Sequence, residues 1–163
     1  MVLGVVGNPK PRSRTFRLAE LVVQRVAEAT SDSEVMVWDL ADWGGRLLDW
    51  KHPENSNAVA TAQGCRWLIV ASPTYKASYT GMLKCFLDLF PYRGLASVRA
   101  IPMMVGAAMD HQLAVDCHLR PVLLELGASC PTQGLYVSEA ELEEDAEKAV
   151  ARWWEANRQW VST

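Results

Sequence analysis

A loop near the start of the chain carries side chains well suited to binding an anion. It runs from Gly7 to Thr15, between the apolar run Val2 to Val6 and a segment with helical spacing. The loop contains three cations and two hydroxyls, at Lys10, Arg12, Arg14, Ser13 and Thr15. A helix that begins here also directs unpaired N–H groups and the positive end of its dipole toward the loop. This pattern predicts a phosphate-binding site.

The same loop lacks two common nucleotide-binding signatures. It contains neither Gly-x-x-x-x-Gly-Lys-Ser/Thr nor Gly-x-Gly-x-x-Gly. Hydroxyls and cations would then hold the phosphate together with the backbone, which suits the phosphate of flavin mononucleotide (FMN). The alternative is an ordinary solvated loop in which Ser13 or Thr15 only caps the helix.

The stretch from Ser72 to Lys84 follows another apolar run and is the second candidate. Pro73 cannot donate a backbone hydrogen bond, so we expect the chain to leave the sheet there. The loop beyond it would present N–H groups to a flat heterocycle, and an aromatic face such as that of Tyr75 for stacking. The alternative is that Tyr75 and Tyr79 only cover the core.

Five apolar runs alternate with segments of helical spacing. The expected strands are Val2 to Val6, Val35 to Trp38, Trp67 to Ala71, Ala100 to Ala108, and one within Cys130 to Val137. The expected helices are Phe16 to Ala29, Ala58 to Gln63, Gly81 to Phe90, Gln112 to Leu126 and Glu139 to Trp160, with Asp39 to Asn57 mostly loop. Such alternation predicts a parallel sheet covered by helices on both faces. The loops after the first, third and fourth strands would share one rim, where ligands bind in such sheets.

The length predicts one domain over residues 1–163, and the hydrophobic half of the residues excludes a disordered chain. The net charge of −3, with both signs interspersed, argues against nucleic acid or an anionic membrane as the partner. Four cysteines and three histidines show no metal-ligand spacing, so we expect reduced thiols and no metal site. The apolar start, Met1 to Gly7, is too short for a membrane span and lacks the basic region of a signal peptide, so we expect a cytoplasmic protein.

Taken together, the two loops resemble those of a known family. Residues 7–15 are similar to the G-S-P-R-x-x-S-x-T loop of the NAD(P)H-dependent FMN reductases, and residues 72–84 to their S/T-P-x-Y-x-x-S-Y-x-G-x-L-K loop. The stretches Asp110 to Asp116 and Leu119 to Leu123 are similar to a third segment in the branch typified by the alkanesulfonate-system FMN reductase. The resemblance covers nearly the whole chain in one order.

This resemblance implies a flavodoxin-like three-layer α/β fold with a five-stranded parallel sheet of order 2-1-3-4-5. The implied FMN site places Lys10, Ser13, Arg14 and Thr15 at the phosphate, Pro73, Thr74, Tyr75 and Lys76 around the isoalloxazine, Ser78 in support of that loop, and Gly106 and Ala107, with the Ala108 backbone, along the ring. The family passes a hydride from NADPH or NADH to flavin N5, and no protein acid or base is obligatory, so no catalytic residue is assigned. A flavin-dependent monooxygenase or a quinone-like acceptor would receive the electrons, and the protein would be a homodimer or homotetramer.

Two positions depart from the family pattern. Gly106-Ala107-Ala108 stands where many members have Gly-Gly or Gly-Gly-Ser/Thr, and Cys117 stands where the branch has an aromatic residue in a π-bulge. Because Pro121 cannot donate to the carbonyl of Cys117, a local disruption of this helix is predicted. FMN as a released product and FMN as a bound prosthetic group both stay open.

Two rival functions stay open beside the reductase. The first is a flavodoxin-type electron carrier without its own NAD(P)H oxidation. Such carriers are usually acidic around the flavin, whereas Lys10, Arg12 and Arg14 make this loop basic. The second rival is a flavin-free interaction domain. A nucleophile-and-base pair at Cys117 and His118 is disfavoured, because adjacent side chains on a helix do not face each other.

Overall fold

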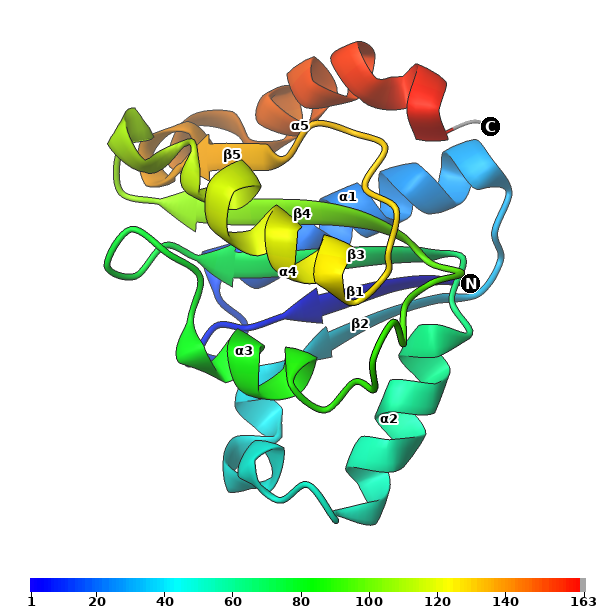
Figure 1. Ribbon diagram of the computed structural model, residues 1–163. Helices are drawn as coiled ribbons and strands as arrows, with labels where there is room; N and C mark the ends of the chain where they lie inside the picture. Colours follow the sequence, from blue (N-terminus) through cyan, green and yellow to red (C-terminus); the bar gives the residue numbers. More distant parts are fainter. Residues whose placement is uncertain (162–163) are drawn as a thin grey trace.

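Five short strands, all running in the same direction, form the central sheet (Figure 1). The computed structural model describes residues 1–161, so the last two positions of the expected domain lie outside the described residues. The strands are β1 (Val2–Val6), β2 (Val35–Asp39), β3 (Trp67–Pro73), β4 (Arg99–Gly106) and β5 (Leu135–Ser138). They pair in the order β2-β1-β3-β4-β5, all parallel, which confirms the predicted topology.

Helices cover both faces of the sheet and give the flavodoxin-like three-layer arrangement. One face carries α1 (Arg14–Thr30) and α5 (Glu139–Val161), and the other carries α2 (Pro53–Gln63), α3 (Gly81–Leu87) and α4 (Arg120–Glu125) (Figure 1). Each face has its own core, because successive strand residues point to opposite faces. For example, Val5 packs with α3, and Val6 with α1.

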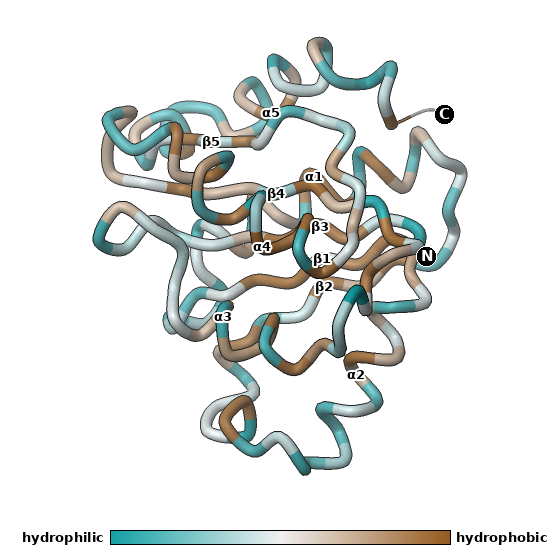
Figure 2. The backbone as a smooth tube through the Cα atoms, viewed as in Figure 1, coloured by the Kyte–Doolittle hydropathy of each residue, from teal (hydrophilic) through white to brown (hydrophobic). Residues whose placement is uncertain are grey.

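The central strands are buried along their whole length, as expected of a parallel sheet with both faces covered. Every residue of β1 and β3 is buried, whereas β2, at one edge of the sheet, is partly exposed. Figure 2 shows the apolar colour following the strands through the middle of the molecule. Within the described residues, no helix is both long and apolar enough to cross a membrane.

The structure corrects the predicted end of the third strand. Ser72 and Pro73 still pair with Met104 and Val105 of β4, two residues beyond the expected end. Pro73 is tolerated because its missing N–H faces the β1 side, and the pairing of β3 with β1 ends already at Ala71. The chain leaves the sheet only after the Thr74 N–H donates to the Val105 carbonyl at 2.6 Å.

The segment predicted to be mostly loop, Asp39 to Asn57, is instead largely helical. It contains the 3-10 helices η1 (Leu40–Asp42) and η2 (Gly44–Leu48), and α2 begins already at Pro53. Proline suits this first helical position, where its missing N–H would have no partner. Trp43 of this segment packs on the core, whereas Trp50 is 70% exposed.

The helix predicted from Gln112 to Leu126 is irregular in its first part. It contains the π-helix η4 (Val115–Leu119), which continues directly into α4, and the separate 3-10 helix η3 (Met109–His111) precedes it. The disruption predicted from Pro121 is thereby confirmed. Arg120 anchors the start of α4, because its guanidinium donates to the carbonyls of Cys130 and Thr132 at 2.9 and 2.8 Å.

Several other predicted ends shift by a few residues. α3 ends at Leu87 rather than Phe90, and β4 ends at Gly106 rather than Ala108. β5 begins only at Leu135 and ends at Ser138, one residue beyond its predicted segment. The last helix is interrupted at Asp145, where φ is −166° and ψ is 94°. The Asp145 carboxylate accepts from the Lys148 N–H at 3.0 Å, so it caps the second part of α5.

Candidate functional site

The carboxyl ends of β1, β3 and β4 lie side by side and bring the three predicted loops to one rim. The loops follow Val6, Pro73 and Gly106, at the ends toward which the arrows point in Figure 1. Backbone hydrogen bonds join them: Gly7 N–H donates to Ala71 at 2.8 Å, and Thr74 N–H donates to Val105. The rim predicted from the alternation of strands and helices is therefore present.

In the first loop, Ser13 is the N-cap of α1, one of the two caps considered from the sequence. Its Oγ accepts from the Phe16 N–H at 3.2 Å, and its backbone is extended. The side chains of Ser13 and Thr15 are buried, and Thr15 Oγ1 accepts from the amide of buried Asn8 at 3.3 Å. Because both hydroxyl oxygens already accept, their hydrogens remain available to an incoming anion.

The three cations of this loop have different surroundings. Arg12 contacts the carboxylates of Asp39 and Asp42 at 3.0 and 2.7 Å, and these two carboxylates raise its pKa, Asp42 the more strongly. Arg14 extends toward α5, where it pairs with Glu139 and Glu143. Lys10 is exposed and has no ion-pair partner among residues 1–161. The sequence did not reveal these acidic partners, because they lie far away along the chain.

The second loop is a tight hairpin that presents Tyr75. Tyr75 and Ser78 exchange backbone hydrogen bonds at 2.8 and 3.0 Å, and Lys76 and Ala77 between them have φ of 51° and 62°. Both positive φ values match the two-residue turns that join antiparallel chain segments, although neither residue is glycine. Tyr75 is 51% exposed at the rim. The N–H groups of Lys76 and Ala77 take no part in this exchange.

Two buried hydroxyls to which the sequence analysis gave no role hold the second loop in place, and one of them ties it to the first loop. Ser72 Oγ accepts from the Thr80 N–H at 3.0 Å, and the Thr80 hydroxyl donates to the carbonyl of Gly7. Thr80 Oγ1 also accepts from the Leu83 N–H at 3.1 Å, so it caps α3. The threonine directly before the Gly81 helix was the signal that a cap stands there.

Gly7 allows α3 to approach the first loop. A Cβ placed on Gly7 would lie 2.4 Å from the Cβ of Leu83 and 2.9 Å from its Cα. Any side chain here would therefore push the start of α3 away from the phosphate loop. The close contact and the Thr80 hydrogen bond hold the same two segments together.

In the third loop, Gly106 lies under the side chain of Tyr136 from β5. A Cβ on Gly106 would lie 1.9 Å from the Tyr136 hydroxyl and 3.1 Å from Thr74 Oγ1. The Tyr136 hydroxyl donates to the Ala108 carbonyl at 2.7 Å. Ala107 and Ala108 are both exposed, so their methyl groups face the solvent side of the rim rather than the core.

The Thr74 hydroxyl is a buried polar group without a partner of regular hydrogen-bond geometry. It still lies near enough to Tyr136 to lower the pKa of that phenol, while burial, the larger effect, raises it. A buried hydroxyl without a partner costs stability. Its position at the rim indicates that a ligand's polar atom would complete its bonding.

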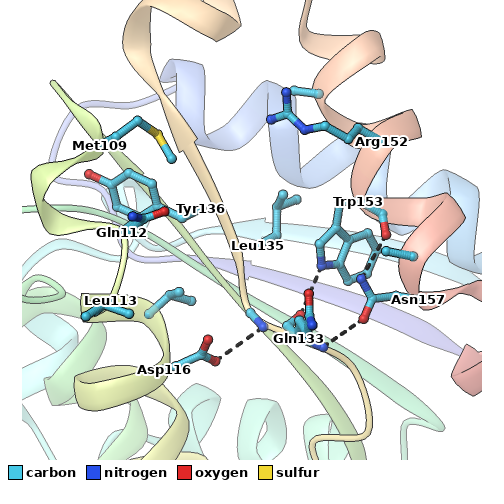
Figure 3. A pocket seen from close by; sticks show the side chains of 14 residues that line it. Met109, Gln112, Leu113, Asp116, Gln133, Leu135, Tyr136, Arg152, Trp153 and Asn157 are labelled. Carbon is cyan, nitrogen blue, oxygen red and sulfur yellow. Dashed lines mark hydrogen bonds between the residues drawn. The ribbon is translucent and has the colours of Figure 1, made fainter.

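A cavity of about 410 Å³ lies beside this rim, along the open edge of β5. Figure 3 shows Met109 and Tyr136 on one side of it, and Trp153 and Asn157 on the other. The Trp153 indole donates to Gln133 at 3.0 Å, and buried Asn157 accepts from the Gln133 N–H at 2.8 Å. These bonds satisfy the polar groups on the α5 side, so that wall of the cavity is structural.

The rim residues fit a phosphorylated flavin. The start of α1 supplies two hydroxyls and unpaired first-turn N–H groups for a phosphate. The hairpin supplies an exposed aromatic ring and two N–H groups outside its own hydrogen-bond exchange, and Thr74 supplies a buried hydroxyl without a hydrogen bond of regular geometry. The structure brings the predicted residues of all three loops to this rim, with one exception in direction: the Arg14 guanidinium points to α5.

Comparisons with known proteins agree with this chemistry. The profile of the family described as NADPH-dependent FMN reductase matches residues 1–142. An FMN reductase (NADPH) of Pseudomonas putida is 35% identical over 148 residues, which cover 87% of this chain and 73% of that protein. An FMN reductase (NADPH) of Escherichia coli is 33% identical over 144 residues, covering 86% and 74%. The crystal structure of an NADH:FMN oxidoreductase in its apo form superposes with a TM-score of 0.80 at 32% identity, covering 93% of this chain and 87% of that one. This chain belongs to the NADPH-dependent FMN reductase family.

Proposed function

We propose that this protein reduces FMN with electrons from NADPH or NADH, at the rim formed by its three loops. The observation that carries the proposal is the meeting of the Ser13 cap, the Tyr75 hairpin and the Gly106 loop at one edge of the sheet. FMN, when bound, accepts a hydride at N5 and thereby supplies the redox chemistry. The residues of the chain bind and orient the flavin, and none of them is assigned as a catalytic acid or base.

The phosphate is proposed to lie at the start of α1. The hydroxyls of Ser13 and Thr15 donate to its oxygens, together with the first-turn N–H groups and the positive end of the helix dipole. Lys10 and Arg14 add positive charge, and Arg14 must then exchange its glutamate partners for the phosphate.

The isoalloxazine is proposed to lie between the second and third loops. Tyr75 offers an exposed aromatic face, and Pro73 and Thr74, at the end of β3, form the base of the proposed ring site. Lys76 and the rest of the turn closed by Ser78 supply N–H groups to the ring, because the N–H groups of Tyr75 and Ser78 already donate to each other's carbonyls. Gly106 and Ala107 border the ring from β4.

For the nicotinamide donor and for the electron acceptor, we propose a class of molecule rather than a single one. Relatives are named for NADPH and for NADH, so both donors belong in the test. We place the protein in the cytoplasm, as a homodimer or homotetramer that passes electrons to a flavin-dependent monooxygenase or a quinone-like acceptor. Four unpaired cysteines among the described residues support a reducing compartment, and exposed Leu48 and Trp50 support self-association.

The test is a titration followed by an assay. FMN fluorescence is measured while purified protein is added, and oxidation of NADPH and of NADH is then followed with and without added FMN, with FMN alone as the blank. Quenching together with oxidation that exceeds the blank is the expected result. Quenching without oxidation would indicate the flavodoxin-type carrier instead, and no quenching would indicate a flavin-free domain. Oxidation that requires added FMN identifies FMN as a substrate, whereas a protein purified yellow holds it as a prosthetic group.

A further inference from the structure

Tyr136 on β5 is buried, but its hydroxyl reaches out of the core to the rim. Its neighbours Leu135 and Val137 pack into the core with α1 and α5, and Tyr136 points to the opposite face, as strand alternation requires. The side chain also lines the cavity along β5, and Figure 3 shows it beside Met109 at one side of that cavity. Tyr136 is 8% exposed.

The Tyr136 hydroxyl donates to a carbonyl that water could otherwise satisfy. It donates to the Ala108 oxygen at 2.7 Å, yet Ala108 is an exposed residue whose carbonyl would find water. The bond satisfies the phenol hydroxyl of the buried Tyr136 side chain, and it also holds the loop between Gly106 and Met109 in one shape.

The Tyr136 hydroxyl also leaves no space for a side chain at Gly106, the last residue of β4. A Cβ on Gly106 would lie 1.9 Å from the Tyr136 hydroxyl and 2.9 Å from its ring carbon Cζ. On the other side it would lie 3.1 Å from Thr74 Oγ1. Tyr136 therefore contacts the loop after β4 directly and lies next to the loop after β3, the two loops proposed to enclose the flavin ring.

We propose that Tyr136 is a positioning residue for the flavin ring: its hydroxyl holds the Gly106–Ala108 loop in the shape that borders the isoalloxazine. This inference rests on the proposed function. Tyr136 acts on the ring end of the ligand and not on the phosphate end, which lies across β3 at the start of α1.

The hydroxyl remains a donor under ordinary conditions. Burial raises the pKa of Tyr136 above its usual value, and the nearby Asp110 carboxylate acts in the same direction. The two nearby arginines are turned elsewhere. Arg120 donates to Asp116 and to the Cys130 and Thr132 carbonyls, and Arg152 donates to Glu141. The bond to Ala108 is therefore present throughout the neutral range.

The test compares Tyr136→Phe, which removes only the hydroxyl, with the parent and with Tyr92→Phe, whose hydroxyl is on an 83% exposed side chain. Affinities for FMN and for riboflavin, which lacks the phosphate, are measured by fluorescence quenching, and the visible spectrum of bound FMN is recorded. We expect Tyr136→Phe to lower the affinity for both flavins by about the same factor, three- to tenfold, which corresponds to the loss of one neutral hydrogen bond. The visible spectrum of bound FMN should also change. Tyr92→Phe should match the parent.

Two outcomes would overturn the inference while the proposed function stands. One is a parent and a Tyr136→Phe variant with equal affinities and equal spectra, and the other is a loss of affinity for FMN but not for riboflavin. A parent that binds neither flavin would overturn the proposed function and this inference with it.

Urea unfolding first shows that each variant is folded, and a second measurement then tests the same contact from the side of the loop. Gly106→Ala is introduced alone and together with Tyr136→Phe. If the hydroxyl shapes the loop, Gly106→Ala should reduce flavin affinity more in the parent than in the Tyr136→Phe background, because the new methyl then no longer meets the hydroxyl. Equal losses in both backgrounds would contradict the positioning role.

Discussion

The guanidinium of Arg14 lies 2.5 Å from a carboxylate oxygen of Glu143, a residue 129 positions further along the chain. Arg14 opens α1 beside the phosphate loop, and Glu139, which also contacts it at 3.5 Å, begins α5. A phosphate at this loop therefore competes with two carboxylates for the same cation. The three side chains are 46%, 68% and 49% exposed, in the order Arg14, Glu143, Glu139, so this pairing is weak and exchangeable.

Replacing Glu143 by Gln should tighten FMN binding. The substitution removes one competing charge from Arg14, and for an exposed pair the expected gain is about 0.2–1 kcal/mol. Riboflavin affinity should not change, because riboflavin has no phosphate. Quenching titrations with both flavins measure the effect, and Glu144→Gln, at an exposed neighbouring position, is the matched control. An equal change for both flavins would show that Glu143 acts on something other than the phosphate.

Replacing Arg14 by Ala should weaken FMN binding by about 1.5–3 kcal/mol, the range for hydrogen bonds to charged groups. Riboflavin again serves as the ligand without a phosphate, and its affinity should stay at the parent value. Arg17→Ala is the matched control, since Arg17 is exposed on the same helix one turn further on. Unchanged FMN affinity in the Arg14→Ala variant would remove Arg14 from the phosphate site.

Replacing Thr80 by Val should destabilise the protein and loosen the rim. The substitution keeps the shape but removes the cap of α3 and the hydrogen bond to the Gly7 carbonyl. We expect the free energy of unfolding in urea to fall by about 1–2 kcal/mol, and FMN affinity to fall with it. Thr61→Val is the control, because the exposed Thr61 hydroxyl only bonds to Asn57 within its own helix. Equal losses in the two variants would argue against a special role for Thr80.

The pairing at the start of α5 should make stability depend on pH. Glu141 accepts from Arg152 at 2.8 Å and from the N–H and hydroxyl of Ser138 at 3.0 Å each, and these bonds, that of Arg152 first, lower the pKa of Glu141. A carboxyl with a lowered pKa in the folded state stabilises the protein above its unfolded pKa of about 4.3. That contribution is lost as the pH falls through the folded pKa.

Glu141→Gln should therefore lower the free energy of unfolding near neutral pH, by less than about 1 kcal/mol for this partly exposed pair. The difference from the parent should shrink as the pH falls below the unfolded pKa of about 4.3, and it should vanish once the carboxyl of the folded parent is protonated as well. Urea unfolding across this pH range measures it. Glu147→Gln, exposed on the same helix, should follow the parent at every pH. A difference that grows toward acid pH would contradict the assignment.

The sequence by itself determined the order of elements, the parallel sheet and the rim on which the three loops meet. These follow from local properties: apolar runs such as Val2 to Val6 form buried strands, and the helical spacing between them requires crossovers of one hand. The Ser13 cap and the helix disruption near Pro121 were predictable for the same reason, because each depends on neighbouring residues only. The ends of several elements were not, since pairing with a neighbouring strand carries β3 through Pro73.

Only the tertiary structure decided where the polar side chains of the rim turn. Arg14 meets Glu143, the Thr80 hydroxyl meets the Gly7 carbonyl 73 positions away, and the Tyr136 hydroxyl meets Ala108, 28 positions away. Such contacts depend on how closely whole elements pack, as in the approach of α3 to Gly7, and no local pattern encodes that distance. The assignment of the site residues, from Lys10 to Ala107, therefore stays a prediction that binding experiments can test. The geometry of the rim that carries them is determined by the fold.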